Sequence, residues 1–232
     1  MFGDKHTYDR LIHEIVHGAR AAVVFVDFAR SPEARYPVPI EEAYTATTWM
    51  AEHGRMVNVD ATRLAVVGDS AGGNMAAAIT LLAKERHGPS ITHQVLFYPV
   101  TDATFDATFD TPSYLAYQEG YMLTREGVQW SWQQYAPAET VRQEPTASPL
   151  QASRHQLQGL PPALVITAEF DVLRDEGEAY AHQLIEAGVA VTATRYLGTI
   201  HAFINLGRMA GTPAARAAVA QANDALRKAF SR

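Results

Sequence analysis

The chain contains no cysteine and no long apolar run. Without a thiol among its 232 residues, disulfide bonds, thiolate metal ligands and a thiol nucleophile are excluded. No segment approaches the about 20 consecutive apolar residues that a transmembrane helix requires. Charged side chains interrupt residues 1–20, so we expect no secretory signal there. These absences favour a cytoplasmic protein that does not enter the membrane.

Positive charge is also scarce. The 19 lysines and arginines are outnumbered by 25 acidic residues, which gives a net charge of −6. Such a chain offers no basic stripe for nucleic acid and no polybasic segment for anionic lipid, so we expect neither partner. An apolar content of 47% is typical of globular proteins, and 232 residues suffice for one domain with a substantial core. We therefore expect residues 1–232 to form a single domain.

The hydrophobic pattern alternates between two periods along the chain. Short apolar runs predict strands buried on both faces of a parallel sheet, at residues 21–28, 64–67, 95–98, 163–167 and 189–196. Helical spacing predicts helices between and around them, at residues 5–17, 40–53, 72–86, 124–135, 175–187 and 213–230. Gly18 is expected to end the first helix, and residues 101–121 are expected to form an irregular loop. The class is α/β, with a mostly parallel sheet flanked by helices.

One turn between a predicted strand and a predicted helix carries a reactive side chain. The sequence Gly-Asp-Ser-Ala-Gly-Gly-Asn occupies residues 68–74 and contains the pattern G-x-S-x-G in the strand–turn–helix setting that this motif requires. The turn exposes the hydroxyl of Ser70, and it places the backbone N–H of Ala71 at a helix N-terminus, where it can stabilise an oxyanion. We predict Ser70 as a nucleophile and Ala71 as an oxyanion-hole donor.

A serine nucleophile needs a base, and the base needs an orienting carboxylate. Asp171 and His201 each lie just past the end of a predicted strand, in the order Ser, acid, His that this kind of sheet uses. We predict Asp171 as the acid and His201 as the base. Glu169 is the alternative acid, and Asp175 is the better candidate to cap the following helix.

Several further motifs strengthen this interpretation. They are Tyr98-Pro99, Ser148-Pro149-Leu150, Leu160-Pro161-Pro162-Ala163, the run from Asp171 to Glu176, and His201-Ala202-Phe203. Together with residues 68–74 they resemble the hormone-sensitive lipase family of α/β-hydrolases, which are mostly bacterial carboxylesterases. The resemblance implies hydrolysis of short-chain carboxylic esters through an acyl-enzyme, with no cofactor and no metal. It matches Ser70, Asp171 and His201 to the family's catalytic triad, and we predict that Asp69 and Phe203 contact the substrate.

The resemblance also bears on partners. The expected partner is a small-molecule ester. Members of this family often pair through their last strand, which here corresponds to residues 189–196, so a homodimer is expected to form through that strand.

The sequence departs from the family at its start. The family has a His-Gly-Gly-Gly segment whose glycine N–H groups complete the oxyanion hole. This sequence has none, and its residues 1–5 resemble the stretch directly after that segment. We therefore expect the cap helices and the first three strands to be missing, with a gap in the middle of the sheet. A start at an internal methionine or a fragment is favoured over a second chain that fills the gap. The alternative function is a catalytically silent or impaired α/β-hydrolase fragment.

Two other features of the sequence could bear on function. Residues 13–17 spell H-E-x-x-H, the zinc-protease pattern, but His13, Glu14 and His17 fall on the solvated face of the helix and no third ligand follows at a recognisable spacing. We therefore expect no zinc site. Aromatic side chains at Trp130, Trp132 and Tyr135 fit either core packing or an acyl pocket, and the roles of Tyr114, Tyr117 and Tyr121 stay open.

Overall fold

The computed structural model describes residues 4–104 and 109–231, and a four-stranded parallel sheet forms its centre. The strands follow one another in space in the order β1-β2-β3-β4, with bounds Leu64–Asp69, Ile91–Phe97, Ala163–Phe170 and Val191–Ile200. One row across the sheet runs through Val67, Val95, Leu164 and Thr192. The predicted α/β class and four of the predicted strands are confirmed.

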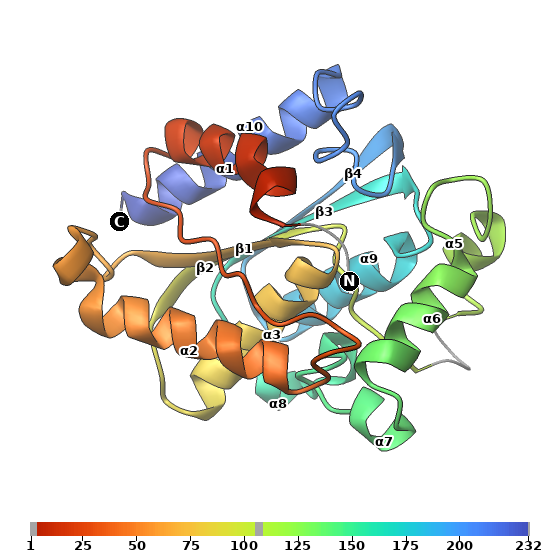
Figure 1. The fold of residues 1–232 in the computed structure, drawn as a ribbon, viewed down its shortest axis with the longest axis horizontal. Helices are drawn as coiled ribbons and strands as arrows, with labels where there is room; N and C mark the ends of the chain where they lie inside the picture. Colours follow the sequence, from red (N-terminus) through yellow and green to blue (C-terminus); the bar gives the residue numbers. More distant parts are fainter. Residues whose placement is uncertain (1–3, 105–108, 232) are drawn as a thin grey trace.

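Helices cover both faces of the sheet (Figure 1). Helices α1 and α10 lie on one face, and α2, α3, α8 and α9 lie on the other. Their bounds are Lys5–Ala19, Pro213–Phe230, Val38–His53, Ala71–Glu85, Arg154–Leu157 and Arg174–Glu186. In the part of the chain that the structure describes, no helix is long and apolar enough to cross a membrane.

Alternation along the central strands builds a separate core on each face of the sheet. In β2, the side chains of Val95 and Phe97 join the core beside α1 and α10, whereas Leu96 joins the core beside α3 and α9. All three side chains are fully buried. A strand that contributes to two cores needs apolar residues at successive positions, which is why these strands are continuous apolar runs in the sequence.

A third cluster of buried side chains lies beyond the carboxyl ends of the strands. Three short helices build it: α5 (Pro112–Ala116), α6 (Arg125–Tyr135) and α7 (Glu139–Arg142). Two 3₁₀ helices, η1 (Gly54–Val57) and η2 (Pro149–Gln151), lie elsewhere in the chain. Helix α5 falls inside residues 101–121, which were expected to be irregular throughout; residues 105–108 of that segment lie outside the described residues. The cluster joins α5 and α6 to the turn after β3, because Tyr114, Trp132 and Val172 all belong to it.

The first predicted strand is not formed. Residues 21–30 make no ladder with any strand of the described chain, and β1 is an edge of the sheet. The side chains still alternate, since Ala21 and Val23 pack with the core beside α10 and Val26 and Phe28 pack with the core beside α3. The apolar run reflects this burial, whereas a strand also needs a neighbouring backbone to pair with. No described residue supplies that backbone.

The first helix continues past its predicted end. Asp4 caps it by accepting hydrogen bonds from the backbone N–H groups of His6 and Thr7, at 3.0 and 2.9 Å. The helix then runs through Gly18 to Ala19. Gly18 is needed for a close approach to α10 rather than for a stop, because a Cβ atom there would lie 2.0 Å from Nδ2 of Asn223.

This contact gives a test of the packing between α1 and α10. In an exposed helix, replacing glycine by alanine stabilises by about 1 kcal/mol. Here Gly18→Ala displaces the Asn223 side chain, whose Nδ2 donates to the carbonyl of Glu14 at 3.2 Å. We expect a net loss of about 1–2 kcal/mol in the free energy of unfolding, measured by urea denaturation.

The double variant Gly18→Ala/Asn223→Ala is the control, since it removes the side chain that the new methyl group meets. The free energy of unfolding of this double variant should be close to that of Asn223→Ala alone. A Gly18→Ala protein more stable than the parent contradicts the packing assigned to Gly18.

Candidate active site

Ser70 occupies a strained turn between β1 and α3. Its backbone has φ 55° and ψ −120°, a region that residues with a side chain rarely adopt. The turn is so tight that a Cβ atom on Gly68 would lie 2.0 Å from the carbonyl oxygen of Gly72. Hydrogen bonds to the segment at the end of β2 hold it: Ser70 N–H donates to Phe97 O at 2.9 Å, and Val100 N–H donates to Ser70 O at 3.2 Å. This turn carries the hydroxyl beyond the carboxyl end of the sheet.

The three residues predicted as a catalytic set lie in hydrogen-bond contact. His201 Nε2 is 2.9 Å from Ser70 Oγ, and His201 Nδ1 is 2.7 Å from Asp171 Oδ2. Asp171 follows β3 and His201 follows β4 directly, as the sequence predicted. Both side chains are buried. When the histidine keeps its proton on Nδ1, facing the carboxylate, Nε2 is free to accept the serine proton. The arrangement can therefore activate a hydroxyl nucleophile.

A backbone donor for an oxyanion lies beside the serine. Ala71 is the first residue of α3, so its N–H is one of the four that have no carbonyl partner within the helix. The positive end of the helix dipole is at the same place. This position of Ala71 fits the predicted oxyanion-hole donor.

Aromatic side chains pack behind the histidine. The ring of Tyr98 meets that of His201 edge-on, with centroids 4.9 Å apart, and meets that of Phe203 at 5.8 Å. Tyr98 and Phe203 are fully buried. Phe203, which was expected to contact substrate, thus packs in the core beneath His201 rather than facing an open cavity. Tyr98, directly after β2, packs against the imidazole of His201, a contact that the sequence did not indicate.

The turn that carries Asp171 is fixed by a buried carboxylate. Glu176, in the first turn of α9, accepts hydrogen bonds from the backbone N–H of Thr101 at 2.6 Å and of Asp102 at 3.3 Å, and from the hydroxyl of Tyr114 at 3.1 Å. Burial raises the pKa of Glu176 well above its usual range, and the nearby Asp102 adds to the effect. Glu176 therefore connects the helix after Asp171 to the segment that follows β2.

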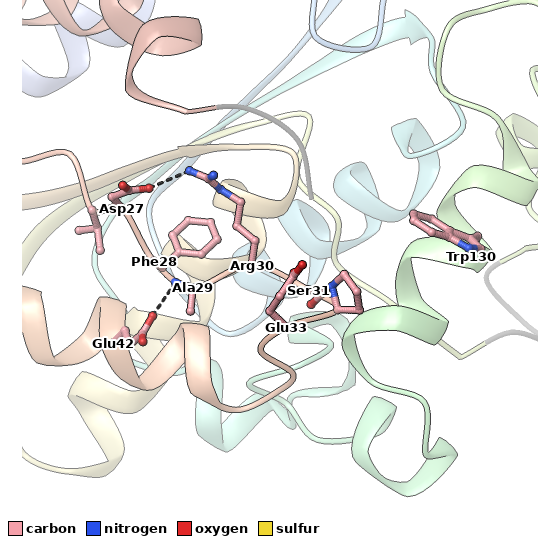
Figure 2. A pocket seen from close by; sticks show the side chains of 10 residues that line it. Asp27, Phe28, Ala29, Arg30, Ser31, Glu33, Glu42 and Trp130 are labelled. Atoms are coloured by element: carbon pink, nitrogen blue, oxygen red, sulfur yellow. Dashed lines mark hydrogen bonds and ion pairs between the residues drawn. The ribbon is translucent and has the colours of Figure 1, made fainter.

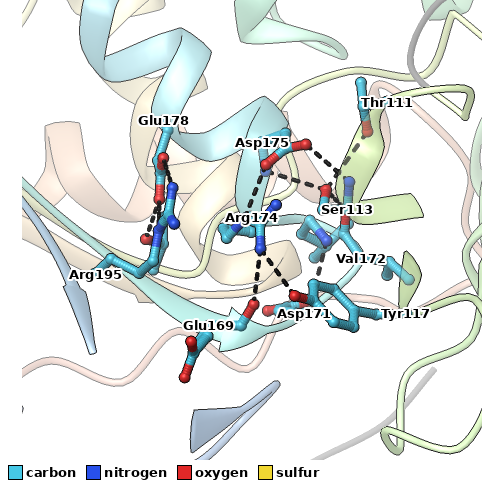
Figure 3. A network of polar contacts seen from close by, with 12 residues as sticks. Thr111, Ser113, Tyr117, Glu169, Asp171, Val172, Arg174, Asp175, Glu178 and Arg195 are labelled. Carbon is cyan, nitrogen blue, oxygen red and sulfur yellow. Dashed lines mark hydrogen bonds and ion pairs between the residues drawn. The ribbon is translucent and has the colours of Figure 1, made fainter. Parts of the chain in front are cut away.

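Polar contacts between α5 and α9 fix the same turn from its other side (Figure 3). Ser113 N–H donates to Asp175 Oδ2 at 2.8 Å, and Ser113 Oγ donates to the carbonyl of Val172 at 2.8 Å. Asp175 is thus not the helix cap that we expected. Asp171 itself accepts the N–H of Leu173, the N-cap residue, at 3.0 Å, because its second carboxylate oxygen is directed toward the first turn of the helix.

The two remaining acidic candidates have other partners. Glu169, the alternative acid, accepts the backbone N–H of Gly198 at 2.7 Å. Asp69, which was expected to contact substrate, accepts the amide of Asn205 at 2.7 Å. Burial raises the pKa of Asp69 above its usual value. The contact between Asp69 and Asn205 brings the nucleophile turn and the histidine loop together.

An open cavity of about 980 Å³ lies beside the extended segment that follows α1. Residues 26–33, Glu42 and Trp130 line it; Figure 2 shows Trp130, on α6, across from the segment that carries Phe28 and Arg30. Trp130 is 48% exposed, whereas Trp132 is buried and Tyr135 packs against the cores. Of these three aromatic residues, Trp130 borders the cavity and the other two serve packing.

Residues 13–17 lie on α1, away from the triad. His13 Nδ1 contacts the carbonyl of Asp9 at 2.7 Å, and Glu14 forms ion pairs with Arg10 and Arg216. Within residues 4–104 and 109–231, no group of three histidine, aspartate or glutamate side chains is arranged to hold a metal ion. Glu14 joins α1 to α10 through Arg216.

Comparisons with known proteins agree with this geometry. A family model described as the alpha/beta hydrolase fold matches residues 1–205, a range that contains all three triad residues. A carboxylic ester hydrolase of Mycobacterium tuberculosis, LipN, is 40% identical over 220 residues, which cover 92% of this chain and 57% of the relative. The ethyl acetate hydrolase of Pseudomonas putida is 37% identical over 206 residues, covering 88% of this chain and 63% of the relative.

Solved structures of esterases are similar over almost the whole chain. A thermostable esterase of Pseudomonas putida is 50% identical with a TM-score of 0.95, and the match covers 98% of this chain and 70% of that one. A thermophilic carboxylesterase from a metagenomic library, EstE1, is 36% identical with a TM-score of 0.92, and covers 99% and 76%. The chain spans between 57% and 63% of the length of the first curated relatives that it matches.

The raised pKa of the buried Glu176 predicts how the free energy of unfolding depends on pH. Because the folded-state pKa of Glu176 is raised, the folded protein binds more protons than the unfolded chain between the usual glutamate pKa and the raised one. Stability therefore falls as pH rises through that window. Glu176→Gln keeps an acceptor for the two N–H groups but cannot titrate, so its free energy of unfolding should fall less between about pH 5 and pH 9.

A matched control lies on the same helix. Glu178 pairs with Arg195 and has a lowered pKa, so Glu178→Gln should leave the parental slope in this pH range. Urea unfolding across the pH range measures all three proteins. Equal slopes for the parent and Glu176→Gln contradict a proton-binding role for Glu176.

Proposed function

Because this chain belongs to the alpha/beta hydrolase family, in its hormone-sensitive lipase branch, we propose that it hydrolyses carboxylic esters of short-chain acids. The two hydrogen bonds that place His201 between Ser70 and Asp171 carry this proposal. The relative named as an ethyl acetate hydrolase supports a small acyl group. A small-molecule ester is thus the proposed partner, and the reaction needs no cofactor.

The geometry supports a two-step mechanism. His201 Nε2 takes the proton of Ser70 as Oγ attacks the ester carbonyl, and the Ala71 N–H donates to the resulting oxyanion. The protonated His201 then gives its proton to the departing alcohol, which leaves an acyl-enzyme on Ser70. Water, deprotonated by His201, attacks this ester, and the protonated His201 returns its proton to Ser70 Oγ as the acid leaves. Asp171 holds the imidazole in the required orientation and stabilises its charged form.

A catalytically silent form is the alternative function. Against it, the triad is assembled in the chain as described, with both hydrogen bonds at ordinary lengths. These two hydrogen bonds favour an active hydrolase over a silent form.

The proposal predicts a burst of product and its dependence on one hydroxyl. With p-nitrophenyl butyrate, whose leaving group is good, acylation should outpace deacylation, so the parent should release about one equivalent of p-nitrophenolate rapidly and then turn over more slowly. Ser70→Ala should lower the rate by about 10³-fold or more and abolish the burst.

Ser153→Ala is the matched control, because Ser153 caps the short helix α8 on the exposed surface. It should keep the parental burst. Equal rates for Ser70→Ala and the parent would remove Ser70 from the reaction.

We propose a cytoplasmic location. We also propose that two copies of the chain pair through the last strand. Strand β4 pairs with β3 along one edge, and no strand of the described chain pairs with the other. An unpaired edge of this length is a template for a second strand. Leu197 on this strand is 71% exposed, which fits a contact with a second copy.

Sedimentation velocity tests this pairing. The weight-average mass should approach that of two chains as concentration rises, and Leu197→Asp should shift the protein toward one chain because a charge is costly in a closed contact. Leu115→Asp, at a half-exposed leucine of α5, is the control and should leave the mass unchanged. A single-chain mass at every concentration contradicts pairing through β4.

A further inference from the structure

Asn205 is the polar side chain that links the histidine loop to the nucleophile turn. It lies four residues after His201, and its Nδ2 donates to Asp69 Oδ2 at 2.7 Å. Asp69 is the last residue of β1 and directly precedes Ser70. One hydrogen bond therefore joins the neighbour of the nucleophile to the loop that carries the base.

The histidine loop itself is a compact unit. Ala202 has φ 60°, Asn205 N–H donates to Ala202 O at 2.8 Å, and Phe203 N–H donates to Ile200 O at 3.3 Å. The guanidinium of Arg10, on α1, donates to the carbonyl of Ile204. Because the loop is internally bonded, a restraint on Asn205 is transmitted to His201.

The amide of Asn205 is oriented for this one contact. Its Oδ1 is buried and has no hydrogen-bond partner within the part of the chain that the structure describes. A buried unpaired oxygen costs free energy, and the reverse orientation would place that oxygen against the Asp69 carboxylate. The observed orientation keeps the bond to Asp69 and leaves the oxygen unpaired.

Several groups surround the carboxylate of Asp69. Burial raises its pKa, and the hydrogen bonds from Tyr8 and Asn205 and the interaction with His201 oppose that rise. Four side chains from neighbouring elements face Asp69, namely Tyr8 on α1, Tyr98 after β2, and His201 and Asn205 after β4. The charge of Arg30 acts on Tyr8, and the charge of Asp171 acts on Tyr98. Tyr8 and Asn205 bond to the carboxylate of Asp69.

We propose that Asn205 is a positioning residue: through Asp69 it holds the His201 loop at the distance from Ser70 at which Nε2 reaches Oγ. The inference rests on the proposed ester hydrolysis. The hydrogen bond between Asn205 and Asp69 sets the distance between base and nucleophile.

Exchanging the two side chains tests this hydrogen bond. Asn205→Asp places two carboxylates in contact, so the loop should move away from Ser70; kcat for p-nitrophenyl butyrate should fall by about 10–100-fold with KM little changed, as a displacement near 1 Å causes. Asp69→Asn/Asn205→Asp restores one donor and one acceptor and should recover kcat to within about threefold of Asp69→Asn. Asn58→Asp, at an exposed position, is the control for the added charge.

A second readout does not require turnover. A fluorophosphonate modifies a serine that is activated by its base, so Asn205→Asp should slow the modification of Ser70. The double variant should recover the modification rate of Asp69→Asn.

The outcomes keep this inference distinct from the proposed function. If the parent shows no turnover above Ser70→Ala, the proposed hydrolysis fails, and the rate of fluorophosphonate modification of Ser70 still decides the inference. A parental kcat or a parental modification rate in Asn205→Asp, or no recovery in the double variant, overturns the role of Asn205. Urea unfolding of each variant shows whether a loss of kcat is a loss of folded protein.

Discussion

The backbone strain at Ser70 is the constraint on which the rest of the site depends. A residue with a side chain in such a conformation costs about 1–3 kcal/mol, and neighbouring contacts must offset this cost. Besides the bonds to the segment after β2, they include those of Asn74, whose backbone N–H donates to Ser70 O at 3.1 Å and whose Nδ2 donates to the carbonyls of Val100 and Ala147 at 3.0 and 2.7 Å. The turn therefore keeps its shape only while the segment after β2 stays in register with β1.

The site is assembled from the carboxyl ends of four adjacent parallel strands. β1 supplies Ser70, the segment after β2 supplies the Tyr98 ring, and the turns after β3 and β4 supply Asp171 and His201. Each turn is fixed by side chains distant in sequence, such as Glu176, which reaches the backbone after β2. Parallel pairing brings these groups to one edge of the sheet, and the buried hydrogen bonds between turns set the distances that proton transfer requires.

Local patterns predicted the elements and the triad, because both depend on short stretches of sequence. Buried strands are apolar runs, and each triad residue follows such a run directly. Residues 21–28 have the same pattern, but strand formation needs a neighbouring backbone, which no local pattern encodes. Asn205 and Glu176 could not be found in the same way: their partners lie 136 and 75 residues away, and a glutamate in the first turn of a helix has the pattern of a solvated end rather than a buried acceptor.

The central claim is that the fold activates the hydroxyl of Ser70 through His201. Fluorophosphonates phosphonylate an activated serine and leave ordinary serines unmodified, so they report activation without requiring turnover. The most direct measurement is mass-spectrometric mapping of the modified peptide after treatment of the parent and of His201→Gln. We predict modification confined to the peptide that contains Ser70 in the parent, and about 10³-fold slower modification without the imidazole. An unmodified Ser70 in the folded parent, or equal modification rates in both proteins, would contradict the claim.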